Sequence, residues 1–331
     1  AESVIRFPLN NYESTIPDFV WEMDKTRLEL TSAGYDELKK RLWSMPARDL
    51  ILGDEKNLFQ GPLFTATSQN ADSLKFIGFG ASFDILKSEL SIRDVRYIRV
   101  ADAALVLNDG LVSVGKKGVM KPFANIQLAT LHDSLIHVLH SANISIQSKN
   151  HLKGNAYFDY TDGAKINYSL KINDLHTDTL TGITYGSSLI SDSLKFKLSE
   201  AFEFKGNVAF EANQPYLRFQ GMTRMHHLSR CLNQKPLWFV FDTIVNPNQV
   251  SITLNNSTMT PEGEKLRAAI MMEADGGLFY PTFFTPVAKS QDLSVMRALG
   301  SVEFPESTQT YVVRTRESQK DVDLPGTVIS I

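Results

Sequence analysis

The stretch Ala142-Asn143-Ile144-Ser145-Ile146 begins with a small residue and has apolar residues two and four positions later. Side chains of a β-strand alternate between two faces, so this spacing predicts a strand with one buried face. The same pattern begins at Ala81, Ala103 and Ala124. A repeat of about 20 residues with one burial pattern is typical of stacked solenoid rungs.

The pattern also begins at Ala156 and Ala164, at the shorter spacing that antiparallel hairpins give. We therefore expect solenoid-like rungs over 70–150 and longer antiparallel strands over 150–260. Turn pairs such as Asp109-Gly110 separate the short alternating runs, which is typical of an all-β chain. The predicted fold class is mainly β: a β-solenoid-like or curved elongated β-sheet with a few flanking helices, with a β-sandwich or jelly roll as the alternative.

Apolar residues recur at helical spacing over 35–43, which predicts one short amphipathic helix. Thr31 or Ser32 supplies a hydroxyl suited to capping its start, and Pro46 ends it.

A second helix is predicted over 260–272, capped at Thr260. These elements divide the chain into a mixed lead-in (1–62), a repetitive β region (63–258) and a mixed helix and strand tail (259–331).

Composition excludes several classes of protein. The net charge of −3 provides no basic field for a nucleic acid, so no nucleic-acid partner is expected. The lone Cys231 cannot form an internal disulfide, and no apolar run reaches the ~20 residues that a membrane-spanning helix needs. The first residue is Ala1 and the last stretch, 323–331, is apolar, so we expect a processed protein or a fragment of a longer one.

Histidines are the first candidates for a metal site. His137 and His140 fall in an apolar run that predicts a strand, where they point to opposite faces, and His132 lies nearby. The adjacent His226 and His227 also diverge, and the interpretation we favour is a polar turn. No metal, cofactor or metal-ligating residue is assigned.

Nucleophiles are equally scarce. Cys231 follows His226, His227 and Arg230, which are groups able to lower a thiol pKa, but a lone cysteine more often packs as a small apolar residue. The Gly-x-Ser-x-Gly elbow of serine hydrolases is absent from the sequence. No catalytic residue is assigned, and an enzyme is not favoured.

Carboxylates and tyrosines cluster over 157–178, an arrangement that a glycosidase or polysaccharide lyase could use. A solvated sheet face shows the same alternation, and that interpretation is favoured. The residues concerned are Tyr157, Asp159, Tyr160, Asp162, Tyr168, Asp174 and Asp178.

Aromatic residues stand between prolines in Phe279-Tyr280-Pro281-Thr282-Phe283-Phe284-Thr285-Pro286. Exposed, the stretch would be an apolar patch for a partner or glycan. Buried, it would be a packed linker, and this second interpretation is favoured.

Parts of 60–225 resemble long β-rich envelope proteins of the Bacteroidota, and more loosely the Gly-Asn-Val β-repeats of OstA-like lipopolysaccharide-transport proteins. The stretches that carry the resemblance are Asp72–Phe76, Val95–Ala103, Asn108–Val114, Ala156–Tyr160, Phe202–Phe210 and Leu217–Gly221. The resemblance implies an exported β-rich protein of the periplasm or outer membrane. The OstA-like repeats would imply an apolar groove for acyl chains.

The expected function is that of a non-catalytic structural, binding or assembly segment of a larger exported cell-envelope protein. Its partners would be other envelope proteins or the remainder of a larger chain, with lipid or glycan as further candidates, while the ligand-binding residues stay unknown. Two alternatives remain open: a carbohydrate-active enzyme on a β-solenoid scaffold, and a transport groove for a hydrophobic ligand such as lipid or lipopolysaccharide.

Overall fold

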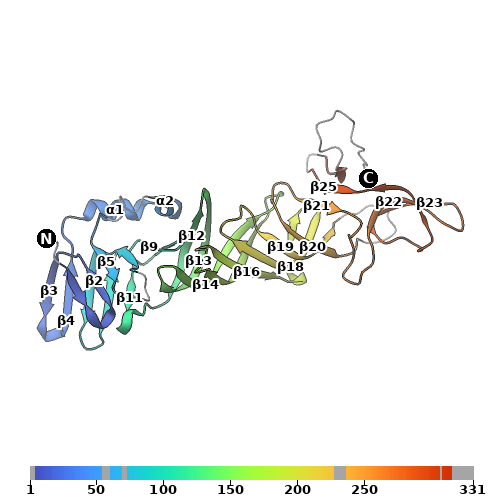
Figure 1. Cartoon of the computed structure of the whole chain (residues 1–331). Helices are drawn as coiled ribbons and strands as arrows, with labels where there is room; N and C mark the ends of the chain where they lie inside the picture. The colour runs from blue at the N-terminus through green and yellow to red at the C-terminus, as the bar shows by residue number, and fades with distance from the viewer. Residues whose placement is uncertain (1–3, 54–59, 69–72, 227–235, 306–307, 315–331) are drawn as a thin grey trace. The chain divides into compact units, whose positions relative to one another are not determined.

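The computed structural model describes residues 4–53, 60–68, 73–226, 236–305 and 308–314. Strands make up 54% of the structure and helices 9%, which confirms the predicted mainly β class. The largest sheet is strongly curled, which agrees with the curved β-sheet that was one of the two predicted architectures (Figure 1).

The chain divides by its contacts into two compact units. Unit 1 comprises Ala1–Asp159, Ser169–Ser188 and Phe210–Pro215, and unit 2 comprises Tyr160–Tyr168, Leu189–Ala209 and Tyr216–Ile331. The division at residues 62 and 258 stays a prediction.

Two small sheets of unit 1 involve the first part of the chain. One has the order β1 (Ile5–Phe7), β2 (Tyr12–Ser14), β5 (Leu63–Ala66), β6 (Lys75–Ile77). The other has the order β11 (Val112–Val114), β8 (Glu89–Arg93), β7 (Gly80–Asp84), β4 (Arg27–Thr31), β3 (Asp18–Glu22).

The largest sheet follows the chain order closely, and β17 (Lys197–Ser199) pairs with it at β18. Its path is β20 (Phe239–Ile244), β19 (Arg218–Met225), β18 (Phe202–Glu211), β16 (Thr184–Ile190), β15 (Asn167–Thr177), β14 (His151–Thr161), β13 (Leu135–Ser148), β12 (Phe123–His132), β10 (Ala103–Val106), β9 (Tyr97–Val100).

The solenoid rungs expected over 70–150 are wrong, because neighbouring strands there are antiparallel. Ala81 lies in the five-stranded sheet, whereas Ala103 lies in the largest one. Val100 pairs with Ala103 across a two-residue connection in which Ala101 has φ 51°. So short a turn can only join antiparallel strands, since parallel neighbours need a crossover of a dozen residues or more.

The first predicted helix is confirmed as α1 (Asp36–Ser44), and Pro46 then starts a further helix, α2 (Ala47–Leu52). The predicted cap is wrong: α1 has no side-chain cap, and the Ser32 hydroxyl donates to the Phe79 carbonyl at 2.6 Å.

Both helices pack on one apolar cluster of unit 1, to which they contribute Leu42, Leu50 and Ile51. The Arg99 guanidinium on β9 donates to the carbonyls of Leu50 (2.8 Å), Ile51 (2.9 Å) and Gly53. These carbonyls belong to the last turn of α2, where a helix leaves its acceptors unpaired. The side chain of Arg99, from a strand distant in the sequence, therefore caps the C-terminus of α2.

The second predicted helix is wrong. Thr260 and Glu264 close a turn (Thr260 N–H to Glu264 O, 2.9 Å), and β22 (Arg267–Met272) follows as a strand. On it, Met271 is fully buried while Ile270 is 39% exposed, which is the alternation of a strand.

Unit 2 also holds two three-stranded sheets. Their orders are β21 (Ser251–Leu254), β25 (Gly300–Glu303), β26 (Val312–Arg314), and β23 (Phe279–Thr285), β22, β24 (Leu293–Ala298). Within the described part of the chain, every helix is too short or too polar to cross a membrane.

Candidate functional site

Polar side chains surround His140 on β13. Its Nε2 lies 3.2 Å from Oδ1 of Asp159 and 3.3 Å from the hydroxyl of Ser169, and its Nδ1 lies 3.1 Å from the hydroxyl of Ser141. The Tyr157 ring stacks on the imidazole at 5.7 Å. Serine, histidine and a carboxylate thus meet here, which the sequence did not show because three strands supply them.

The hydroxyl of Ser141 and the carboxylate of Asp159 contact opposite nitrogens of His140, the connectivity of a catalytic triad. However, the His140 and Asp159 side chains are 42% and 50% exposed. Water screens such contacts, and acyl transfer depends on donors held in a site from which water is excluded. The arrangement therefore fits a solvated sheet face better than a hydrolase site.

His137 has different surroundings from those of His140. Its Nε2–H donates to the Gln214 carbonyl at 2.9 Å, and its ring packs against Phe158 and Phe210 at 6.2 and 5.3 Å. Burial lowers the pKa of His137, so the neutral ring is favoured. His137 is thus part of the apolar packing of unit 1.

Two of the four clustered carboxylates, Asp162 and Asp178, accept hydrogen bonds from the backbone of their own turns. Asp162 is fully buried and accepts the Ile166 N–H at 2.8 Å. The N–H groups of Thr181 and Leu180 bond to Asp178 and hold its pKa below the usual value. Asp178 and the Oδ1 atom of Asp162 are therefore engaged by their own loops.

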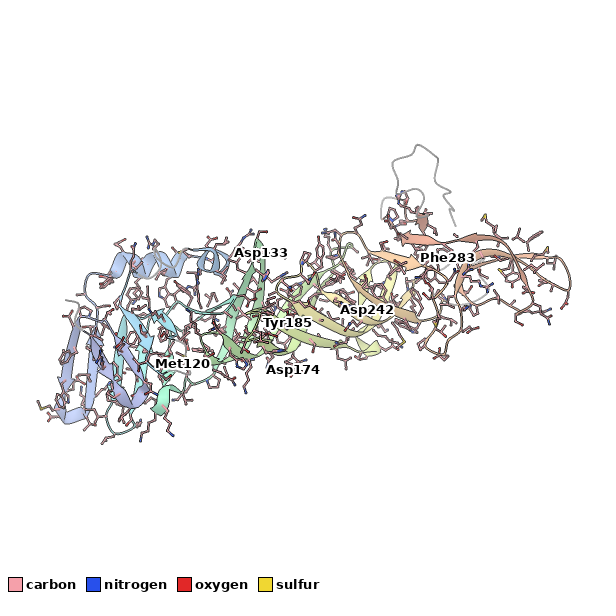
Figure 2. All side chains as sticks on the ribbon, viewed as in Figure 1. Met120, Asp133, Asp174, Tyr185, Asp242 and Phe283 are labelled. Carbon is pink, nitrogen blue, oxygen red and sulfur yellow. The ribbon has the colours of Figure 1, made fainter. Side chains whose placement is uncertain are left out.

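Asp174 differs, since it lies at a register shift of β15 with φ 48° (Figure 2). It borders a shallow hollow of about 510 Å³ in unit 1, together with His176, Lys153, Ser145 and Asn143. Asp159 is not among the residues that line this hollow. The paired carboxylates of a glycosidase would need to face one cleft.

Groups of three or more His, Cys, Asp or Glu able to hold a metal are not found among the described residues. Cys231 and His227 lie outside those residues, as does the apolar stretch 323–331. Arg224, close to His227 in the sequence, belongs to strand β19.

The sequence did not predict a cluster on unit 2 in which two cations, Lys205 and Arg224, contact the aromatic ring of Trp238. The Trp238 ring lies 4.4 Å from Nζ of Lys205 and 4.6 Å from the guanidinium carbon of Arg224. Glu203 accepts from Arg224 at 2.6 Å and contacts His226 at 3.0 Å. Each cation on the ring is worth roughly 0.5–1 kcal/mol at a partly exposed site, so the cluster ties β18, β19 and the start of β20 together.

The strongest candidate surface is one face of the β23-β22-β24 sheet, which we name the apolar face. Ile270 lies opposite Pro281 on one side and Met296 on the other, and Met272 lies in the same way between Phe279 and Leu293. Residues directly opposite in a sheet point to the same face. The apolar face consists of Ile270, Met272, Phe279, Pro281, Leu293 and Met296.

Five of the six residues of the apolar face are exposed, and Met272 is half-buried. Phe279 is 64% exposed, Leu293 58%, Ile270 39% and Met296 38%. The segment 279–286 is not a linker as predicted, because it forms strand β23, and the expected burial holds only for residues 282–285. Phe279 and Pro281 are exposed, whereas Phe283 (labelled in Figure 2) is buried.

The opposite face of this sheet is held in place. The Tyr280 hydroxyl donates to Asp292, which also accepts the N–H of Ala274 at 3.2 Å and of Lys289 at 3.0 Å. The bond from Tyr280 lowers the pKa of Asp292, so this anchor stays charged at neutral pH. These hydrogen bonds stabilise the sheet that carries the apolar face.

Comparison with family models, with curated proteins and with solved structures gives no match to this chain. What the molecule itself defines is a mainly β protein with an exposed apolar sheet face.

Proposed function

We propose that this chain is a non-catalytic binding or assembly segment of a larger exported cell-envelope protein, and that it presents the apolar face to a partner protein. The observation that carries the proposal is the cross-strand continuity of six apolar side chains, five of which are exposed. Contiguous exposed apolar patches mark interaction sites, whereas apolar residues scattered singly are ordinary.

The resemblance of parts of 60–225 to envelope proteins supports export to the periplasm or outer membrane. The open, water-exposed His140 and Asp159 contacts favour binding over hydrolysis.

The acyl-groove alternative finds less support. An open groove leaves apolar side chains accessible to a ligand, yet Leu139, Leu152 and Ile172 of unit 1 are fully buried. Phe196, Phe204 and Phe219 of unit 2 are equally covered and pack on one another.

The test is site-specific photocrosslinking in intact cells with the reactive group at position 279. Position 180 is the matched control, because Leu180 is 94% exposed and lies outside the apolar face. We expect one envelope protein to be captured from position 279 and not from position 180. Equal capture at both positions, or recovery of the chain from the cytoplasm, would contradict the proposal.

A substitution series completes the test. Phe279→Ser with Leu293→Ser should abolish the captured complex while leaving the melting temperature within about 2 °C, because exposed side chains contribute little to folding. Glycan-degrading activity that is lost in Asp159→Ala or Asp174→Ala would favour the enzyme instead. Lipid retained in native mass spectrometry would favour the transport groove.

A further inference from the structure

Strand β3 forms the outer edge of the five-stranded sheet of unit 1 (Figure 1). Among the described residues it pairs with β4 alone, in a regular register from Asp18–Thr31 to Glu22–Arg27. Its other side therefore presents backbone N–H and C=O groups with no strand to receive them. Such an edge is a template for another strand.

The three central side chains of β3 are apolar and exposed. Phe19, Val20 and Trp21 are 58%, 61% and 57% exposed. Phe19 lies directly opposite Leu30 of β4, which is fully buried, and Trp21 lies directly opposite Leu28. Apolar side chains of the five-stranded sheet thus continue outward to its edge strand β3, beyond which no described strand lies.

The two edge strands of the β23-β22-β24 sheet carry features that hinder pairing. In the β23-β22-β24 sheet, β24 has a register shift that leaves Val295 unpaired, and β23 carries Pro281 in its middle. Bulges and prolines blunt sheet edges. β3 has neither within Asp18–Glu22, so its edge is open to pairing along the whole strand.

The acidic residues of β3 restrict which strands can pair with its free edge. Asp18 and Glu22 lie on the same face of β3 as Val20, because their spacing is even. Lys25 contacts Glu22 at 3.1 Å, while Asp18 is exposed and has no ion pair with the described residues.

A second copy of the chain is a poor occupant. Antiparallel pairing of two β3 strands along their full length, centred on Val20, places Asp18 of each opposite Glu22 of the other. Like charges directly opposite in a sheet are destabilising. Opposite charges there are favourable, so a strand with Lys or Arg at both positions fits the edge.

We propose that β3 is a docking edge for an extended segment of another protein, which adds to the sheet as a sixth strand. The segment has apolar residues opposite Phe19, Val20 and Trp21 and basic residues opposite Asp18 and Glu22. This surface is separate from the apolar face of the proposed function, so either proposal can fail without the other.

The test uses the full chain and two synthetic nine-residue peptides, Ser-Ser-Lys-Phe-Val-Phe-Lys-Ser-Ser and the same peptide with Glu in place of Lys. Calorimetry measures affinity, and hydrogen exchange measures protection of the β3 amides. We expect the Lys peptide to bind, to protect 18–22, and to bind at least about fivefold more tightly than the Glu peptide, since two exposed charge pairs change sign.

Charge reversal sharpens the result. The double variant Asp18→Lys with Glu22→Lys should prefer the Glu peptide, whereas Asp24→Lys, a matched change in the exposed turn after β3, should keep the original preference. Equal binding of both peptides, protection elsewhere than 18–22, or no binding of either would overturn the proposal. Protection of β3 that rises with the concentration of the chain alone would also overturn it, because a second copy would then be the occupant.

Discussion

Gly206 on β18 and Gly221 on β19 lie directly opposite each other, and neither position has room for a side chain. A Cβ on Gly221 would stand 2.3 Å from the Lys205 carbonyl oxygen and 2.7 Å from the Gly206 Cα. Gly206 also has φ 138°, a conformation that other residues rarely adopt. The two strands therefore approach through their glycines.

Gly221→Ala should lower the free energy of unfolding by about 2–3 kcal/mol, because the atoms it meets are backbone and cannot move aside. Gly115→Ala is the control, since its nearest contact would be an ordinary 3.7 Å. Urea denaturation of both variants measures the difference. Equal stabilities would show that β18 and β19 can separate at this point.

Tyr311→Phe should cost about 1–2 kcal/mol of stability. The buried Tyr311 hydroxyl lies within donating distance of the carbonyls of Ala201 (3.1 Å) and His226 (3.0 Å), and the substitution keeps the ring while removing this buried donor. Tyr216→Phe is the control, because Tyr216 is 38% exposed. Thermal unfolding monitored by circular dichroism measures the loss of stability. A loss no larger than that of the control variant would refute the anchoring role of the Tyr311 hydroxyl.

Arg99→Lys should release the end of α2. An ammonium group cannot reproduce the planar guanidinium that reaches the carbonyls of Leu50, Ile51 and Gly53. Hydrogen exchange over 47–52 should become faster by about tenfold, equivalent to about 1.4 kcal/mol. Arg48→Lys, an exposed change on the same helix, should leave the exchange rates as they are.

His137 should make the protein less stable in mild acid. Burial lowers the pKa of His137 in the folded chain, whereas the unfolded chain takes up a proton near the ordinary pKa of about 6.5. The unfolded state therefore binds more protons below that pH, so the free energy of unfolding falls as the pH drops through about 6.5. His137→Phe removes the titrating ring, and urea titrations from pH 7.5 to 5.5 should show a flatter dependence. An unchanged slope would disprove the assignment.

Local sequence patterns predicted the structure where local geometry decides it. The alternation in 142–146 predicted a strand, and the spacing over 35–43 predicted α1. The stretch 260–272 misled because alanine, leucine and methionine favour a helix in isolation. Pairing of β22 with strands on both sides overrode that preference.

The candidate surfaces could not be predicted in the same way. The apolar face joins Ile270, Phe279 and Leu293 from three strands, and no local pattern states which strands become neighbours. The Trp238 cluster and the contacts of His140 likewise depend on pairing. The sequence could show that 279–286 is aromatic, but not that Phe279 is exposed while Phe283 is buried.

By itself, the sequence determined that this chain is mainly β and has a short helix over 35–43, because periodicity is a property of the chain alone. The tertiary structure decided that the strands pair antiparallel, that β3 lies at a sheet edge where it pairs with β4 alone among the described strands, and that one face of β22 is buried while the other meets water. The physical reason is that exposure depends on which strands become neighbours, and residues far apart in the chain determine that jointly.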